Sequence, residues 1–194
     1  MIQLILRSSG ILKSLMECTY HRGARFVGRA ASFFLIWKTS FFFIWRTPSL
    51  VELYNTMSLK VIDQILIGTS FSLDLLGFEV EVIPVDRLVK IVGTVGVTVG
   101  EPCIGFEVMA VYVALIFSSF FSKNKARLST YLLGGLALIN LANIARIGLL
   151  AYLVQFDPYL WEVNHKYVFT LVVYFLVFGL WASFVTKEKK DIVS

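Results

Sequence analysis

One uncharged apolar segment near the C-terminal end of the chain restricts its possible folds more than any other feature. The segment YVFTLVVYFLVFGLWASFVT, residues 167–186, contains no charged side chain, and KEKK follows it directly. An α-helix needs about 20 apolar residues to cross the hydrocarbon core of a bilayer, which is about 30 Å thick. A segment of this kind is typical of a transmembrane helix that ends at a polar membrane surface.

The composition extends this prediction to the whole chain. Hydrophobic residues make up 57% of the 194 residues and charged residues only 16%, whereas soluble domains contain roughly 25% charged residues. Three further apolar segments are candidate spans, at 30–45, 104–122 and 128–156, and the first of them extends back to Phe26 if it is a full span. We therefore expect an all-α integral membrane helical bundle of about four to five transmembrane helices.

The distribution of charge predicts the topology. Lys and Arg are concentrated at residues 1–29, 123–127 and 187–190. A chain with four spans places these three segments on one side, which the positive-inside rule identifies as the cytoplasm. The segment 47–101 then lies outside, and it carries seven acidic residues against three basic ones. The net charge of +5 is therefore attributed to topology in a cytoplasmic (inner) membrane rather than to nucleic-acid binding.

These observations divide the chain into three parts. We expect a cytoplasmic, basic, amphipathic N-terminus at 1–29, a membrane-embedded domain at 30–186 with an outer segment at 47–102, and a basic cytoplasmic tail at 187–194. Within the outer segment, residues 48–78 have apolar residues at helical spacing, which favours an amphipathic interfacial helix or helix pair on the outer leaflet or over the bundle. A kinked span is the alternative. The Val- and Ile-rich stretch after it predicts two or three short strands, forming a small extracytoplasmic β-hairpin-like insert.

The insert leads into GEPCIGFE, residues 100–107, where Cys103 lies just before an apolar helix. Pro102 suits a first helical turn, and the positive end of a helix dipole favours the reactive thiolate. The alternative is that Cys103 is a small apolar filler at a helix start. The other cysteine, Cys18, belongs to the basic N-terminus, so the two cysteines do not indicate a disulfide framework.

A second unusual residue is Arg146, which lies within the apolar segment 128–156. Charged residues at membrane depth are rare and usually face the bundle or a water-filled pocket. Asn140 and Asn143 precede Arg146 at steps of three and therefore share its helix face. This polar stripe predicts a lined cavity. Alternatively, Arg146 extends to the outer head groups and the asparagines join neighbouring helices.

The third residue is His165, at the outer start of the last span. The topology brings Cys103, Arg146 and His165 from three consecutive helices to the same outer level. A thiol, an imidazole and a guanidinium are the groups that acyl transfer needs for nucleophilic attack, proton transfer and stabilisation of negative charge. His21 lies with Cys18 in the basic N-terminus and is taken as incidental. No cluster of His, Cys and Asp has the spacing of metal ligands, so we expect neither a metal nor a cofactor.

These motifs resemble those of the exosortase/archaeosortase family. The matching residues, over about 78–186, are Cys103-Ile104-Gly105, Asn143-Ile144-Ala145-Arg146 and His165. The resemblance implies a cysteine protease-like transpeptidase that cleaves proteins ending in a short motif, a hydrophobic helix and basic residues, and then transfers them to a surface anchor. It also implies that Cys103 is the nucleophile, His165 the general acid/base and Arg146 the ion-pair or oxyanion partner. Gly105, Glu107, Asn140 and Asn143 are predicted as supporting residues.

The sequence departs from the family pattern at Glu107. The family often reads Cys-Ser-Gly-Leu-Arg, whereas this chain has Cys103-Ile104-Gly105-Phe106-Glu107. The carboxylate either disfavours the thiolate or pairs with Arg146. The chain is also short for the family, so it resembles a compact subfamily. Two alternatives remain: a non-catalytic membrane scaffold or assembly factor, and a small transport-related protein that uses Arg146.

Overall fold

The computed structural model describes residues 2–119, 125–156 and 167–193. Most of the described residues form long helices, and a small sheet follows the second helix and precedes the third along the chain. The elements, in chain order, are α1 (Ile2–Ile44), α2 (Pro48–Leu75), β1 (Val80–Ile83), β2 (Leu88–Ile91), β3 (Val97–Thr98), the 3₁₀ turn η1 (Glu101–Cys103), α3 (Phe106–Ser118), α4 (Lys125–Leu153) and α6 (Phe169–Val193). The predicted class, an all-α membrane bundle with a small β insert, is confirmed.

Three helices in the described part of the chain are long and apolar enough to cross a membrane. They correspond to Gly23–Ile44, Lys125–Leu153 and Phe169–Lys187. The predicted span at 104–122 is wrong in its bounds, because α3 has only 13 residues, or about 20 Å of helix. The chain before α3 forms a 3₁₀ turn and a left-handed glycine, Gly105, and neither can belong to the α-helix.

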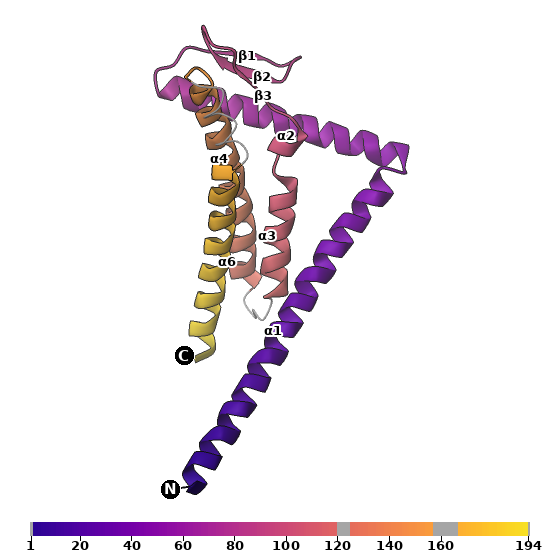
Figure 1. The fold of residues 1–194 in the computed structure, drawn as a ribbon. Coiled ribbons are helices and arrows are strands. Elements are labelled where there is room, and N and C mark those ends of the chain that lie inside the picture. Colours follow the sequence, from indigo (N-terminus) through magenta and orange to yellow (C-terminus); the bar gives the residue numbers. More distant parts are fainter. Residues whose placement is uncertain (1, 120–124, 157–166, 194) are drawn as a thin grey trace.

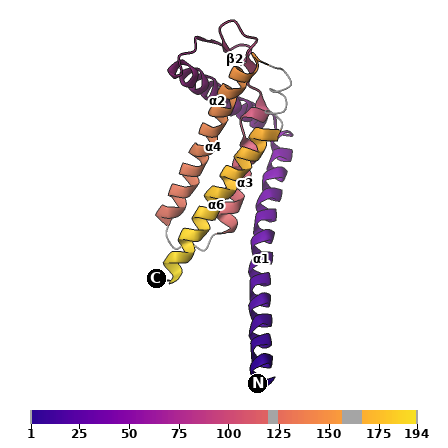
Figure 2. The ribbon, with the colours of Figure 1, turned by 60° about the vertical axis from the view of Figure 1, so that its left-hand side comes forward.

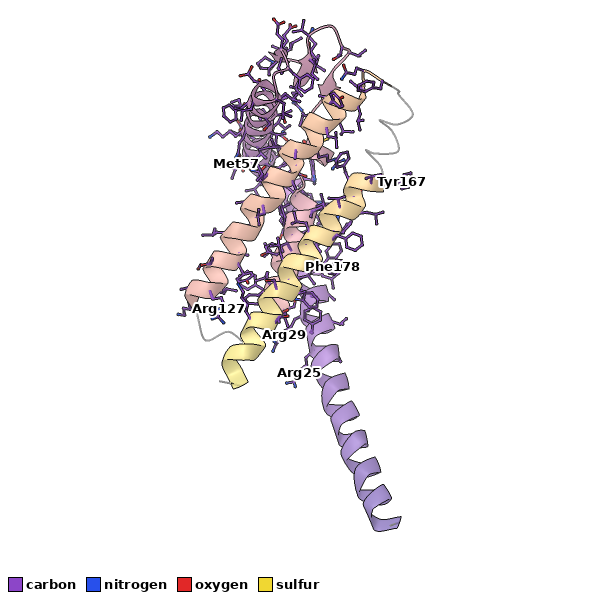
Figure 3. The ribbon with its side chains drawn as sticks, turned by 90° about the vertical axis from the view of Figure 1, so that its left-hand side faces the viewer. Arg25, Arg29, Met57, Arg127, Tyr167 and Phe178 are labelled. Carbon is purple, nitrogen blue, oxygen red and sulfur yellow. The ribbon has the colours of Figure 1, made fainter. Side chains whose placement is uncertain are left out.

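The helices form a bundle with two distinct ends (Figure 1). The views agree that α3, α4 and α6 lie side by side, while α1 runs beside α3 and extends far beyond it (Figures 1 and 2). Both chain termini lie at one end, here called the terminal end, and α2 and the sheet lie at the other, the sheet end. Arg25 and Arg29 of α1 and Arg127 of α4 are placed toward the terminal end, and Tyr167 toward the sheet end (Figure 3).

This arrangement agrees with one part of the predicted topology, since Arg25, Arg29 and Arg127, from two of the basic segments, lie toward the same end of the bundle. That this end is cytoplasmic stays a prediction. The predicted boundary between residues 29 and 30 falls inside the continuous helix α1.

α2 is one helix that crosses the sheet end of the bundle (Figure 1). Pro48 occupies its first turn, where the missing N–H needs no partner. Gly77, with φ 85°, follows its end. The amide of Phe78 there bonds to the carbonyl of Leu73 at 3.1 Å, which closes a Schellman motif. The structure forms a single helix where a helix or helix pair was predicted, and this helix lies across the sheet end of the bundle.

The predicted strands form an antiparallel three-stranded sheet in the order β1-β2-β3. Val80 pairs with Ile91 and Ile83 with Leu88, which fixes the register of β1 and β2. Glu81 and Lys90 are directly opposite each other, and their side chains form an ion pair at 3.0 Å. The sheet leads the chain from the end of α2 to η1 and so delivers Cys103 to the sheet end.

Two apolar clusters fill the interior. The sheet-side cluster joins α2, the sheet, η1 and α4, and its buried members are Ile62, Ile65, Leu66, Leu73, Val89, Ile91, Val97, Val99, Cys103, Ile104, Ile147, Leu150 and Ala151. The bundle cluster joins α3, α4 and α6 and contains Tyr112, Ile116, Ile139, Val177 and Phe184. The candidate site residues Cys103 and Ile104 therefore belong to the sheet-side cluster.

Candidate functional site

Cys103 occupies the last position of the 3₁₀ turn η1. Its amide donates to the carbonyl of Gly100 at 2.9 Å, and the amide of Ile104 donates to the carbonyl of Glu101 at 3.1 Å. Gly105 then adopts φ 78°, and α3 begins at Phe106. The sequence predicts Cys103 just before a helix that starts at about residue 104, whereas α3 starts at Phe106, so the left-handed Gly105 separates the cysteine from the first turn of α3.

The Cys103 side chain is buried, with 7% of its surface exposed. It packs in the sheet-side cluster together with residues of the sheet, such as Val89 and Val97. A buried cysteine behaves as a small hydrophobic residue. In this position the Cys103 side chain therefore contributes to the packing of the sheet-side cluster. Reaction at this sulfur requires that it become accessible from one side.

Asn143 of α4 holds the backbone next to the cysteine. Its Nδ2 donates to the carbonyl oxygen of Ile104 at 3.1 Å, and both residues are buried. A Cβ on Gly105 would overlap the same Nδ2 atom. Glycine is therefore required here for two reasons: its positive φ and the close approach of the amide. The structure thus brings the predicted Cys-x-Gly and Asn-x-x-Arg segments into direct contact.

Arg146 lies one turn beyond Asn143 on α4. Its guanidinium carbon lies 5.9 Å from the centroid of the Phe169 ring at the start of α6, within the range of a cation–π interaction. This contact places the Arg146 guanidinium beside the first residue of α6, at the sheet end of the bundle. A charge at the centre of a transmembrane helix costs about 2.5–3.5 kcal/mol on insertion scales, so such residues usually face protein or water.

A cavity of about 550 Å³ lies beside these residues. Five helices contribute to its walls, and the residues are Trp37, Lys38, Phe41, Tyr54, Glu101, Gly105, Phe106, Glu107, Val108, Asn143, Arg146, Thr170, Val173 and Tyr174. A volume of this size is in the range of small-molecule sites. Arg146 and Asn143 face it from α4, as the polar stripe predicts. Among the described residues, Cys103 is not part of the lining, although Gly105, two residues later, is.

Glu107 forms an ion pair across two helices. Its Oε1 lies 2.6 Å from the Nζ of Lys38 on α1, and the Lys38 ammonium donates this hydrogen bond. One of the two expectations from the sequence was that Glu107 pairs with Arg146, whereas the structure pairs Glu107 with Lys38. Sequence reasoning missed Lys38 as a site residue, although a visible signal was present: Lys38 and Glu107 are each the only charge in an apolar segment. Two isolated opposite charges in neighbouring helices favour a pair, because each is costly alone in hydrocarbon.

The remaining predicted residues have different outcomes. His165 lies outside the described residues, and the side chains of Cys18 and His21 are also outside the described part. Asn140 lies one turn before Asn143 and is not among the lining residues of the cavity. Its Oδ1 is buried without a hydrogen-bond partner in the described structure. The polar stripe therefore contributes two residues to the cavity, Asn143 and Arg146.

This arrangement has a definite chemical capacity. A cavity with a mostly apolar lining lies between the helices, with a guanidinium, an amide, hydroxyls and an ion pair in its walls. In such surroundings, a cation and fixed donors stabilise negative charge more strongly than in bulk water. The site is suited to bind a carbonyl or an anionic group next to the Cys103–Gly105 turn.

Comparison with known proteins identifies a family. The family model described as Transmembrane exosortase (Exosortase_EpsH) matches residues 24–181. The match includes α1 from Ala24 onward, the sheet, the cavity residues and about the first half of α6. No curated protein and no solved structure matches the chain.

Proposed function

Because the chain belongs to the transmembrane exosortase family, we propose that it is a membrane cysteine transpeptidase that cleaves C-terminal sorting signals and transfers the exported protein to a surface anchor. The family implies a transpeptidase- or protease-like role. The substrates proposed here are proteins that end in a short motif, a hydrophobic helix and basic residues. The proposed site lies on the extracytoplasmic face of the inner membrane, which is the sheet end of the bundle.

One observation carries the proposal: the hydrogen bond from Asn143 Nδ2 to the Ile104 carbonyl, at the wall of a cavity that Arg146 also lines. It joins the two described motif segments of the resemblance through a specific contact. A purely structural pair of helices needs neither the left-handed Gly105 nor an arginine beside it.

The proposed reaction proceeds by acyl transfer. The Cys103 thiolate attacks the carbonyl carbon of the scissile peptide bond, and Arg146 stabilises the developing oxyanion. His165 donates a proton to the leaving amine as the C–N bond breaks, which yields a thioester on Cys103. An amine or hydroxyl of the acceptor then attacks the thioester while His165 takes its proton, and the thiolate is regenerated.

The proposed mechanism also requires a movement of the Cys103 side chain before the reaction. Cys103 is not among the residues that line the cavity, whereas Gly105, two residues later, is. We expect the Cys103 side chain to turn toward the cavity when a substrate is bound. Catalytic contacts in free enzymes are often looser than in the reacting complex.

Comparison of C-terminal peptides tests the function in cells. Membranes from cells that produce the protein, or its Cys103→Ala variant, are analysed by mass spectrometry for membrane proteins that have lost their C-terminal helix. The proposal predicts that truncated forms appear with the parent protein and disappear completely with Cys103→Ala and His165→Ala. Identical sets of C-terminal peptides in cells with the parent and with Cys103→Ala would refute it.

A second function is favoured by the burial of Cys103. Arg146 lines the cavity whereas the thiol packs among apolar residues, an arrangement suited to a site for an anionic group without catalysis. In that case Arg146→Ala abolishes the protein's cellular effect, while Cys103→Ala preserves it. The two variants therefore separate the two functions.

A further inference from the structure

The ion pair between Lys38 and Glu107 joins the apolar part of α1, from residue 30 onward, to the first turn of α3. Lys38 is the only charge in residues 30–45, and Glu107 is the only charge in α3. The two residues are 69 positions apart in sequence, and their side chains meet at 2.6 Å. Both line the same cavity as Asn143 and Arg146.

The pair acts on the segment that contains the cysteine. Glu107 lies in the first turn of α3, two residues after the left-handed Gly105. Asn143 of α4 holds the Ile104 carbonyl from one side, and Lys38 of α1 holds the Glu107 carboxylate from another. α4 and α1, which lie far apart in sequence, therefore both contact the chain between Cys103 and Glu107, at Ile104 and at Glu107.

We propose that Lys38 is a positioning residue of the candidate thiol site, acting through Glu107. This inference deepens the proposed function and rests on it for the role of Cys103. Lys38 orients the start of α3 and neutralises a carboxylate that otherwise opposes formation of a thiolate four residues earlier. The departure from the family pattern at Glu107 is thus compensated by a positive charge on α1.

Other ionisable groups surround the same region and remain unchanged in the variants of the pair. Those lining the cavity are Tyr54 on α2, Glu101 on η1, Arg146 on α4 and Tyr174 on α6. In the sheet, Lys90 is paired with Glu81. Since these groups are common to every variant, a difference in pH dependence among the variants isolates the Lys38–Glu107 pair.

The test measures the reactivity of the Cys103 thiol in the full-length protein with Cys18→Ser as the common background. The protein is reconstituted in lipid nanodiscs, and modification by N-ethylmaleimide is followed by mass spectrometry as a function of pH. Because the Lys38 side chain is about half exposed and the Glu107 side chain mostly exposed, we expect Lys38→Met to move the rate profile to higher pH by a few tenths of a unit. Glu107→Gln is expected to move it to lower pH, and the double variant Lys38→Met/Glu107→Gln to return close to the parent profile. Lys38→Arg keeps the charge and is expected to retain the profile.

Lys60→Met serves as a matched control, because it removes an exposed positive charge from α2 and is expected to leave the profile in place. A purely structural bridge predicts that Lys38→Met and Glu107→Gln change the rate in the same direction, without opposite pH shifts. That result overturns the inference. A double variant whose alkylation profile differs from the parent profile more than that of either single variant also overturns it. The alkylation assay requires no substrate, so its outcome is independent of the cleavage experiment that tests the proposed function.

Discussion

Two contacts between α3 and α4 each place a polar side chain against a glycine. In one contact the side chain belongs to α4, and in the other it belongs to α3. At the sheet end, Gly105 before α3 accommodates the side chain of Asn143 on α4. Nearer the terminal end, midway along α3, Gly135 on α4 accommodates the side chain of Tyr112, whose hydroxyl donates to the Tyr131 carbonyl at 2.6 Å. Each contact therefore pairs a glycine with a polar side chain that bonds to a carbonyl oxygen.

The difference between the two contacts lies in their surroundings. The Gly105–Asn143 contact forms a wall of the cavity and lies next to Arg146. The Gly135–Tyr112 contact lies in the bundle cluster, where Tyr112 is fully buried. We infer that both contacts stabilise the helix pair but that only the first supports the chemistry. Substitutions at the two contacts separate these contributions.

Gly105→Ala is expected to have the largest effect. Alanine at φ 78° is strained, and its Cβ overlaps Asn143 Nδ2. We expect the free energy of unfolding to fall by about 2–4 kcal/mol and the reactivity of Cys103 to change at least tenfold. Gly93→Ala is the matched control, because Gly93 also has a positive φ (86°) but nothing within 4 Å of the added Cβ. Equal losses for both variants, in thermal unfolding followed by tryptophan fluorescence, would show that the contact with Asn143 contributes nothing.

Gly135→Ala is expected to destabilise the protein by about 1–3 kcal/mol, since the added methyl group overlaps the Tyr112 ring in a filled interior. Thermal unfolding in detergent measures this loss. The adjacent Gly134 has nothing within 4 Å of an added Cβ, so Gly134→Ala is expected to keep or slightly raise the stability. Once Gly135→Ala is folded, its Cys103 alkylation rate should equal that of the parent. A changed rate would contradict the separation between the two ends.

Asn143→Ala is expected to cost about 1–3 kcal/mol, because the buried Ile104 carbonyl loses its amide donor. Unlike Gly135→Ala, it should also change the pH profile of Cys103 alkylation, since the Cys103–Gly105 turn loses its support. Asn140→Ala is the matched control for stability: its Oδ1 has no hydrogen-bond partner in the described structure, so its removal costs less. Equal destabilisation by the two variants would count against a specific role of Asn143.

The features of the candidate site that were predicted from the sequence are those that follow from helical spacing and from the order of the spans. Asn143 and Arg146 share a face because they are three residues apart on one helix, and the cavity confirms that face. The approach of Cys103 to α4 followed from the alternation of spans. Helical periodicity and charge asymmetry are local properties, so they can be read without coordinates.

The sequence did not predict features that depend on contacts between helices. The Lys38–Glu107 pair spans 69 positions and depends on how α1 lies against α3. The burial of the Cys103 side chain depends on the sheet-side cluster, which α2, the sheet and α4 form together. The start of α3 at Phe106 depends on Gly105, whose left-handed conformation keeps it and the preceding residues out of the helix. Apolar composition alone does not reveal a left-handed residue.

Tyr112→Phe is expected to have the smallest effect of the series. It removes the hydroxyl that donates to the Tyr131 carbonyl but leaves the ring in place against Gly135. We expect a loss of about 1 kcal/mol in the free energy of unfolding and an unchanged alkylation profile for Cys103. Tyr131→Phe, whose hydroxyl faces Ser183 in an exposed position, is expected to cost less. A Tyr112→Phe variant with altered thiol reactivity would mean that the terminal end of the α3–α4 pair is coupled to the site, so that packing along the whole helix pair, rather than Asn143 alone, positions the cysteine.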